Sequence, residues 1–211
     1  VTYHASYKLV ELTGFRNCRS SSTVFTRDGY ETVGGYDDLL TEDLAFAHKC
    51  YRHGLAVRQA RNYTSLMEAP HTLMDFWGQR KRWRIGQVEV LHATLTGQLT
   101  NGSRRRRYVS IWRMLTSIGG SVFLVVLVSK LSVLVLFDAP LFYLLPIAAT
   151  AVVAAGVGWA DPRAGDIDSV VPIALVAPLV YPVFGVLMLK SLLEYGLSWD
   201  GGWYHVEKTG A

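Results

Sequence analysis

Two short motifs in this chain contain residue types that could carry out a reaction. Thr41-Glu42-Asp43 offers a pair of carboxylates, and Gln79-Arg80-Lys81-Arg82-Trp83 follows after residues 44–78. An ionised carboxylate can accept a proton from an attacking hydroxyl group, which is general base catalysis. A guanidinium binds phosphate oxygens through a planar fork, and an indole offers a flat surface on which a sugar ring can stack. Together the motifs indicate an enzyme that uses an anionic, activated donor to build a polymer.

The first motif is predicted to open a helix. Thr41 is suited to the N-cap, and Glu42 and Asp43 fall in the first turn, where acids interact favourably with the helix dipole. Apolar residues then recur at helical spacing until Gly54, which predicts the end of the helix. These three residue types are also common at helix N-termini that have no catalytic role, so this motif alone does not establish catalysis.

The second motif lies on a predicted helix over residues 72–94. Gln79, Arg82 and Trp83 stand at i, i+3 and i+4, so one face presents an amide, a guanidinium and an indole. A basic helix that carries Trp is also typical of a helix lying in a bilayer interface. The two motifs at this interval, directly ahead of apolar segments, favour the catalytic interpretation.

Short β-leaning segments accompany the first motif. Residues 22–25 read as a strand, with turn signals at residues 27–29 and at Gly34-Gly35. Residues 56–60 and 63–69 are predicted to form two further short strands. Helices alternating with strands indicate an α/β domain in this half of the chain.

Most of the remaining chain is predicted to span a membrane. Residues 117–137, 141–159 and 170–189 are apolar and match the roughly 20 residues needed to cross about 30 Å of hydrocarbon. Residues 104–107 are all arginine, which places the start of the first span in the cytoplasm. Three prolines interrupt the third segment, so it either spans the bilayer or is re-entrant. We expect about three spans in a multi-pass protein of the cell membrane, with the catalytic part cytoplasmic.

Composition excludes several classes. The 211 residues carry a formal charge of +4 and the pI is about 9.1, but the basic residues cluster ahead of an apolar segment and do not indicate nucleic acid binding. Two cysteines give neither a disulfide framework nor metal-ligand spacing. The chain does not begin with Met and shows no signal peptide, so we expect it to be the C-terminal portion of a longer protein.

These motifs resemble those of the membrane-integrated family 2 glycosyltransferases, which include cellulose, hyaluronan and poly-N-acetylglucosamine synthases. The resemblance rests on Gly34-Gly35-Tyr36-Asp37-Asp38, on Thr41-Glu42-Asp43 and on Gln79-x-x-Arg82-Trp83. The tail from Trp203 to Gly210 is similar to the family's late tryptophan and basic gating motif, with Val206 where the family often has Thr. The resemblance covers only the second half of such an enzyme.

The resemblance implies a fold and a domain order. We expect an α/β fold, the C-terminal part of a GT-A-type nucleotide-sugar transferase domain, followed by an α-helical transmembrane region. The expected boundaries are the following. Residues 1–70 complete the transferase domain, 71–107 form an interface helix and basic loop, 108–190 form the transmembrane region, and 191–211 form an amphipathic tail with the possible gating motif.

The resemblance also assigns roles. Asp43 is the expected base for the acceptor hydroxyl, which displaces UDP from the sugar with inversion, and Glu42 supports it. Arg82 and Lys208 would neutralise the departing diphosphate, and Trp83 would stack on the acceptor sugar. The expected substrate-binding residues are Gln79, Arg82, Trp83, Trp203 and Lys208.

A divalent cation, Mg or Mn, is expected in the full-length enzyme. Its Asp-x-Asp ligands would lie upstream, so no metal ligand is assigned in this chain; Asp166-Ile167-Asp168 matches the letters but lies between predicted spans. The expected partners are a UDP-sugar donor, a glycan or lipid-linked acceptor and the lipid bilayer, without nucleic acid. Without the donor-binding half, the 211 residues alone are expected to be inactive.

Two alternatives stay open. One is a non-processive transferase that acts on a lipid-linked acceptor. The other is a non-enzymatic scaffold or transporter component of the membrane, which would bind no nucleotide.

Overall fold

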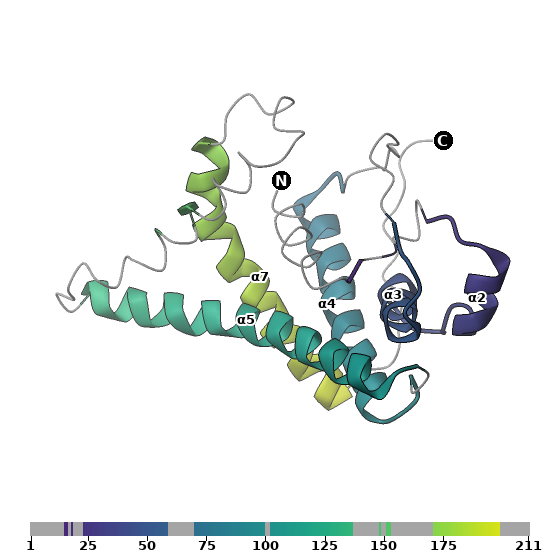
Figure 1. The fold of residues 1–211 in the computed structure, drawn as a ribbon. Coiled ribbons are helices and arrows are strands. Elements are labelled where there is room, and N and C mark those ends of the chain that lie inside the picture. The colour runs from purple at the N-terminus through teal and green to yellow at the C-terminus, as the bar shows by residue number, and fades with distance from the viewer. Residues whose placement is uncertain are drawn as a thin grey trace. The chain divides into compact units, whose positions relative to one another are not determined.

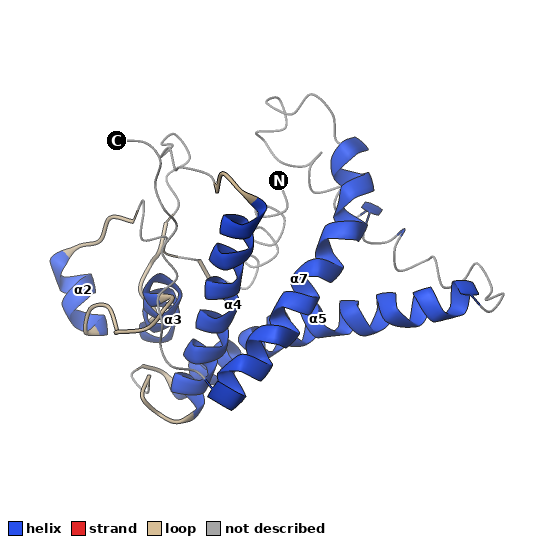
Figure 2. Ribbon diagram, turned by 180° about the vertical axis from the view of Figure 1, so that it is seen from behind, coloured by secondary structure: helices blue, strands red, loops and turns tan. Residues whose placement is uncertain are grey.

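The structure is a computed structural model that describes residues 15, 16, 18, 23–58, 70–99, 102–136, 148, 151–152 and 171–198 (Figure 1). Within these residues the secondary structure is helical. The helices are α2 (Arg27–Val33), α3 (Glu42–His53), α4 (Leu73–Leu95), α5 (Arg104–Leu136) and α7 (Val171–Ser198). Figure 2 shows the same helices from behind, with loops but no strand among the other residues that are described.

The predicted α/β fold is therefore wrong. Residues 23–25 form a loop, because the next residue, Thr26, caps α2 by accepting a hydrogen bond from the Gly29 N–H at 3.2 Å. The turn predicted at residues 27–29 is instead the first turn of that helix. Residues 56–58 are also a loop, and the rest of the second and the whole of the third predicted strand lie outside the described residues. Here the capping of a following helix overrides β propensity, which depends strongly on context.

The predicted transmembrane region is also corrected. Within the described residues, no helix combines the length and the apolar character that a bilayer crossing requires. The first and third predicted spans overlap α5 and α7, and only residues 148, 151 and 152 of the second are described.

Apolar residues of these helices can be covered by protein instead of lipid. Met114 and Ile118 of α5 and Leu187 and Met188 of α7 are all buried in the structure. Phe123 of α5 and Val183 and Val186 of α7 are exposed. The spans were predicted from apolar length, and the sequence did not show that part of each apolar segment is buried against protein.

The chain divides into two compact units, each considered by itself. One unit comprises Val1–Thr13 and Gly119–Val186, and the other comprises Gly14–Ile118 and Leu187–Ala211. In the first unit α5 and α7 come close at Gly185, where a Cβ atom would lie 2.4 Å from the Ser121 carbonyl oxygen. Both motifs lie in the second unit.

Helix α3 occupies the centre of the second unit. It contacts α2 and α4, and both ribbon views place it between them (Figures 1 and 2). Its residues 45–50 are all buried, and α4 contributes Ile85, Val90 and Ala93 to the core. The helix that begins with the first motif is therefore enclosed by protein along most of its length.

Candidate active site

The first motif lies at the N-terminus of α3, as predicted. The Thr41 carbonyl accepts the first helical hydrogen bond, from the Ala45 N–H at 3.1 Å, and Glu42 and Asp43 occupy the first turn. The predicted stop is confirmed, since Gly54 ends the helix with a left-handed φ of 76°. The Thr41 side chain makes no capping hydrogen bond, in contrast to its predicted role.

The two carboxylates of the motif are half-buried beside Tyr36. One Asp43 oxygen accepts a hydrogen bond from the Leu44 N–H at 2.7 Å. Burial raises the pKa of Tyr36, and the neighbouring Cys18, Glu42 and Asp43 raise it further. The phenol therefore stays protonated at neutral pH, so it can donate a hydrogen bond next to the two acids.

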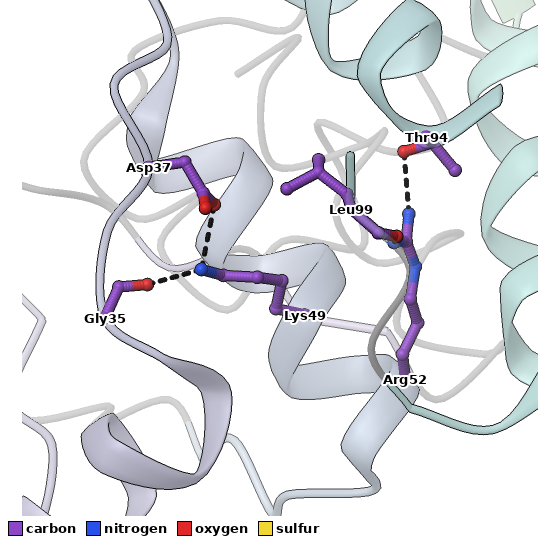
Figure 3. A network of polar contacts seen from close by, with 6 residues as sticks. All are labelled: Gly35, Asp37, Lys49, Arg52, Thr94 and Leu99. Carbon is purple, nitrogen blue, oxygen red and sulfur yellow. Dashed lines mark hydrogen bonds and ion pairs between the residues drawn. The ribbon is translucent and has the colours of Figure 1, made fainter. Parts of the chain in front are cut away.

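The loop ahead of the motif is fixed by a lysine from α3. Gly34 and Gly35 have φ values of 76° and 72°, which favour glycine. The buried Lys49 donates a hydrogen bond to the Gly35 carbonyl at 2.6 Å and pairs with Asp37 at 2.8 Å (Figure 3). The Gly-Gly-Tyr-Asp segment is thereby tied to the same helix as Asp43.

The second motif lies on α4, and the predicted helix is confirmed. Thr72 is its N-cap and accepts a hydrogen bond from the Asp75 N–H at 3.1 Å. Gln79, Arg82 and Trp83 are half-buried. The Arg80 guanidinium stacks over the Trp83 ring, 4.4 Å from its centroid, which is a cation–π contact. One face of the indole is therefore covered by Arg80.

Helix α4 meets the start of α3 at two points. A Cβ atom on Gly86 would lie 2.4 Å from Thr41 Cγ2 and 2.6 Å from Thr41 Oγ1, so only glycine fits there without movement. One turn further, Glu89 accepts a hydrogen bond from the Leu40 N–H at 2.8 Å. These contacts bring the helix of the second motif against the first residues of the first motif.

The spacing along α4 shows which of its faces is involved. Gln79, Arg82, Gly86 and Glu89 follow one another at intervals of three, four and three residues, which places them on one side of a helix. Gly86 and Glu89 contact Thr41 and Leu40, and Gln79 and Arg82 lie on the same side of α4, two turns and one turn before Gly86. The amide and the guanidinium are thus on the helix face that also makes the two contacts with the start of α3.

The C-terminal turns of α7 also contact α4. The Lys81 ammonium pairs with Glu194 at 2.8 Å, and Glu194 also pairs with Lys190 at 2.6 Å. His92 and the Tyr195 hydroxyl are 2.7 Å apart. Helix α4 is therefore fixed by contacts that do not involve α3.

Buried polar side chains of α3 form hydrogen bonds with neighbouring segments. The Arg52 guanidinium has no exposed surface and donates to Thr94 Oγ1 at 2.8 Å and to the Leu99 carbonyl (Figure 3). Burial lowers the pKa of Arg52 to about 10, so it remains charged at neutral pH. His48 is hydrogen-bonded to the Ser110 hydroxyl of α5. The orientation of α3 is set by a network that connects it to α4, to α5 and to the loop between them.

The burial of His48 leads to a prediction about the stability of the protein at low pH. Burial, with the positive charges of Arg52 and Arg113, lowers the pKa of His48 to about 3. The stabilisation from the neutral imidazole is complete above the ordinary pKa of about 6.5 and is lost as the pH falls toward 3, because the unfolded chain binds the proton first. We expect the free energy of unfolding, measured with urea, to fall from pH 7 to pH 4, and to fall less steeply in His48→Asn. Equal slopes would contradict this explanation.

Sequence reasoning did not assign a role to Gly86 or Glu89. A signal for Gly86 was present, since a glycine inside a helix costs about 1 kcal/mol and usually marks close packing. It stands one turn after Arg82. Nothing local identified Glu89, because its partner is a backbone N–H of another segment.

The close approach at Gly86 can be tested by adding one methyl group. We expect Gly86→Ala to lower stability by about 1–3 kcal/mol through overpacking against Thr41, less the gain in helix propensity of about 1 kcal/mol. Thr41→Ala removes the two nearest atoms, so the double variant should recover much of the loss. Urea denaturation of the four proteins measures this coupling, and additive effects would show that the two residues are not in contact.

The other predicted site residues lie outside the part of the chain that the structure describes. Trp203 and Lys208 belong to the tail beyond residue 198, and Asp166-Ile167-Asp168 is likewise outside. The described residues contain no group of three or more His, Cys, Asp or Glu side chains placed to hold a metal ion. These residues therefore do not supply a site for the expected divalent cation.

Comparison with known families identifies the class of protein. Residues 20–159, more than half of the chain, match the family described as glycosyl transferase family group 2. The chain belongs to this family of glycosyltransferases.

Individual relatives match a shorter segment. Poly-β-1,6-N-acetyl-D-glucosamine synthases from Staphylococcus aureus strains COL, MSSA476 and N315 are each 36% identical over 70 residues, which is 33% of this chain and 17% of the synthase. The chain thus spans less than a fifth of the length of these curated relatives. No solved structure matches the chain.

Proposed function

We propose that the complete protein transfers a sugar residue from a UDP-sugar to a growing polysaccharide with inversion, and that Asp43 is the general base. The observation that carries this proposal is the contact of α4 with the start of α3 at Gly86 and Glu89. It joins the helix that begins with the Glu42 and Asp43 carboxylates to the side of α4 that carries the Gln79 amide and the Arg82 guanidinium. Membership of a glycosyltransferase family and relatives named as polysaccharide synthases support it.

Asp43 acts on the acceptor in this mechanism. Its carboxylate takes the proton of the acceptor hydroxyl as the oxygen bonds to the anomeric carbon. The bond from that carbon to UDP breaks on the opposite face, so the configuration inverts. Glu42, beside it in the same turn, supports the motif, and Tyr36 can donate a hydrogen bond to either acid.

The second motif acts on the donor and the sugar. Arg82 stabilises the negative charge that develops on the departing diphosphate, with Gln79 as a hydrogen-bonding neighbour one turn away. Trp83 stacks on the acceptor sugar. Because Arg80 lies over one face of the indole, the sugar cannot stack on that face while this contact is present. Trp203 and Lys208 remain proposed contributors from the tail.

A divalent cation would add electrostatic stabilisation of the diphosphate in the full-length enzyme. The described residues do not supply its ligands, so each step above is assigned to side chains of this chain. The cell-membrane location and the cytoplasmic side of the catalytic part remain predictions from the sequence.

The polymer-forming sugar proposed first is N-acetylglucosamine. It is the sugar in the name of the relatives that match this chain. The 36% identity over part of the chain makes UDP-N-acetylglucosamine the first donor to test.

The test is UDP release by the full-length protein from UDP-N-acetylglucosamine, UDP-glucose and UDP-glucuronate, with the length of the product measured. Release from one donor with a long product supports a polysaccharide synthase. Short products would favour a non-processive transferase. No release from any donor would overturn the proposal in favour of a scaffold.

A further inference from the structure

One carboxylate of α4 is bonded to the backbone ahead of the catalytic motif. Glu89 Oε2 accepts the hydrogen bond of the Leu40 N–H at 2.8 Å. Glu89 is half-buried and Leu40 is buried, so solvent does not readily replace either partner. Leu40 precedes Asp43 by three residues, and Glu89 follows Arg82 by two helical turns.

The start of α3 depends on α4 for its position. The N-cap residue Thr41 has φ −125° and ψ 67°, and its side chain makes no capping hydrogen bond. Its Oγ1 atom is buried without a partner among the described residues. Thr41 instead packs on Gly86. The first turn of α3 is thus held from outside, by Gly86 and Glu89, where a helix is commonly held by its own cap.

The charge on Glu89 is not favoured by its surroundings. Burial raises the pKa of Glu89 and the nearby Asp38 raises it further, while the bond from Leu40 lowers it. Tyr195 of α7 is also close enough to feel this charge. A neutral amide of the same shape would avoid the cost of burial and keep an oxygen acceptor. The acceptor oxygen, which a Gln side chain would also supply, is therefore the feature of Glu89 that holds Leu40.

We propose that Glu89 is a positioning residue for the transfer reaction: through its bond to Leu40 it fixes the Asp43 carboxylate relative to the turn that carries Arg82. This inference rests on the proposed function of Asp43. The base and the diphosphate-binding turn lie on different helices, and the bond from Leu40 to Glu89 joins the segment just before the base to α4. A displacement of about 1 Å between reacting groups can reduce turnover about 100-fold.

Three variants of the full-length enzyme test the proposal. Glu89→Met keeps the length of the side chain but removes the acceptor, and Glu89→Gln keeps the acceptor. Glu31→Gln is the control, because Glu31 is an exposed carboxylate of α2 that pairs with Arg27 and holds neither motif. We expect Glu89→Met to lower kcat about 10- to 100-fold with little change in the donor KM, and Glu89→Gln and Glu31→Gln to stay close to wild type.

Each outcome decides the question. Wild-type kcat in Glu89→Met, or equal losses in the Met and Gln variants, would overturn the positioning role. A Glu89→Met protein that fails to fold, seen as a lost thermal transition, would place the bond in stability and also overturn it. Failure of the proposed function is seen separately, as no UDP release by wild type or full turnover in Asp43→Asn.

Discussion

Replacing Asp43 with Asn in the full-length enzyme is expected to reduce UDP release by about 10²- to 10⁴-fold, the usual contribution of a general base. Asn keeps an oxygen that can accept the Leu44 N–H, so the start of α3 retains its local hydrogen bond. It cannot accept the proton of an acceptor hydroxyl. The loss should therefore appear in kcat, while the affinity for UDP measured by calorimetry remains unchanged.

Glu42→Gln is the matched control for this result. Glu42 lies in the same turn and has the same charge, but it is assigned a supporting role. A smaller loss in Glu42→Gln than in Asp43→Asn is expected. Unchanged turnover in Asp43→Asn, or a larger loss in the Glu42 variant, would show that the base is assigned to the wrong residue.

Arg52→Met is expected to have the largest effect on stability, lowering the free energy of unfolding by about 3–5 kcal/mol. Arg52 is fully buried, and hydrogen bonds to a charged group are each worth about 1.5–3 kcal/mol. The substitution also leaves the Leu99 carbonyl without its donor, at a cost of about 1–3 kcal/mol, which the apolar Met side chain only partly offsets.

The measurement is urea denaturation of the full chain, with Arg27→Met as the control. The Arg27 side chain is 89% exposed and pairs only with Glu31, 3.6 Å away, among the contacts described. Its replacement should change stability by less than about 0.5 kcal/mol. Similar shifts in the two midpoints would show that the Arg52 network contributes little.

Local signals predicted the helices of the site well. Gly54 marks the end of α3 and Thr72 marks the start of α4, because caps are encoded by single residues and their neighbours. Thr41 marks the start of α3 by its position, although its side chain makes no capping hydrogen bond. The shared face of Gln79 and Arg82 also follows from helical spacing alone. These features need no information about the rest of the chain.

Contacts between segments distant in the sequence were not predictable. Residues 23–25 have β-forming side chains but precede a helix cap, and the apolar positions of α5 and α7 include residues covered by protein. The approach of Gly86 to Thr41 and the bond from Leu40 to Glu89 each join two segments. The residue pattern of one segment does not indicate which distant segment it contacts.

The buried Lys49 has a consequence for local opening. Its ammonium group joins the Gly35 carbonyl and the Asp37 carboxylate to the middle of α3. The loop cannot detach from the helix without exposing that charge to solvent and breaking both contacts. Residues 34–37 and the first turns of α3 should therefore exchange their amide hydrogens as one cooperative unit, with a single opening free energy.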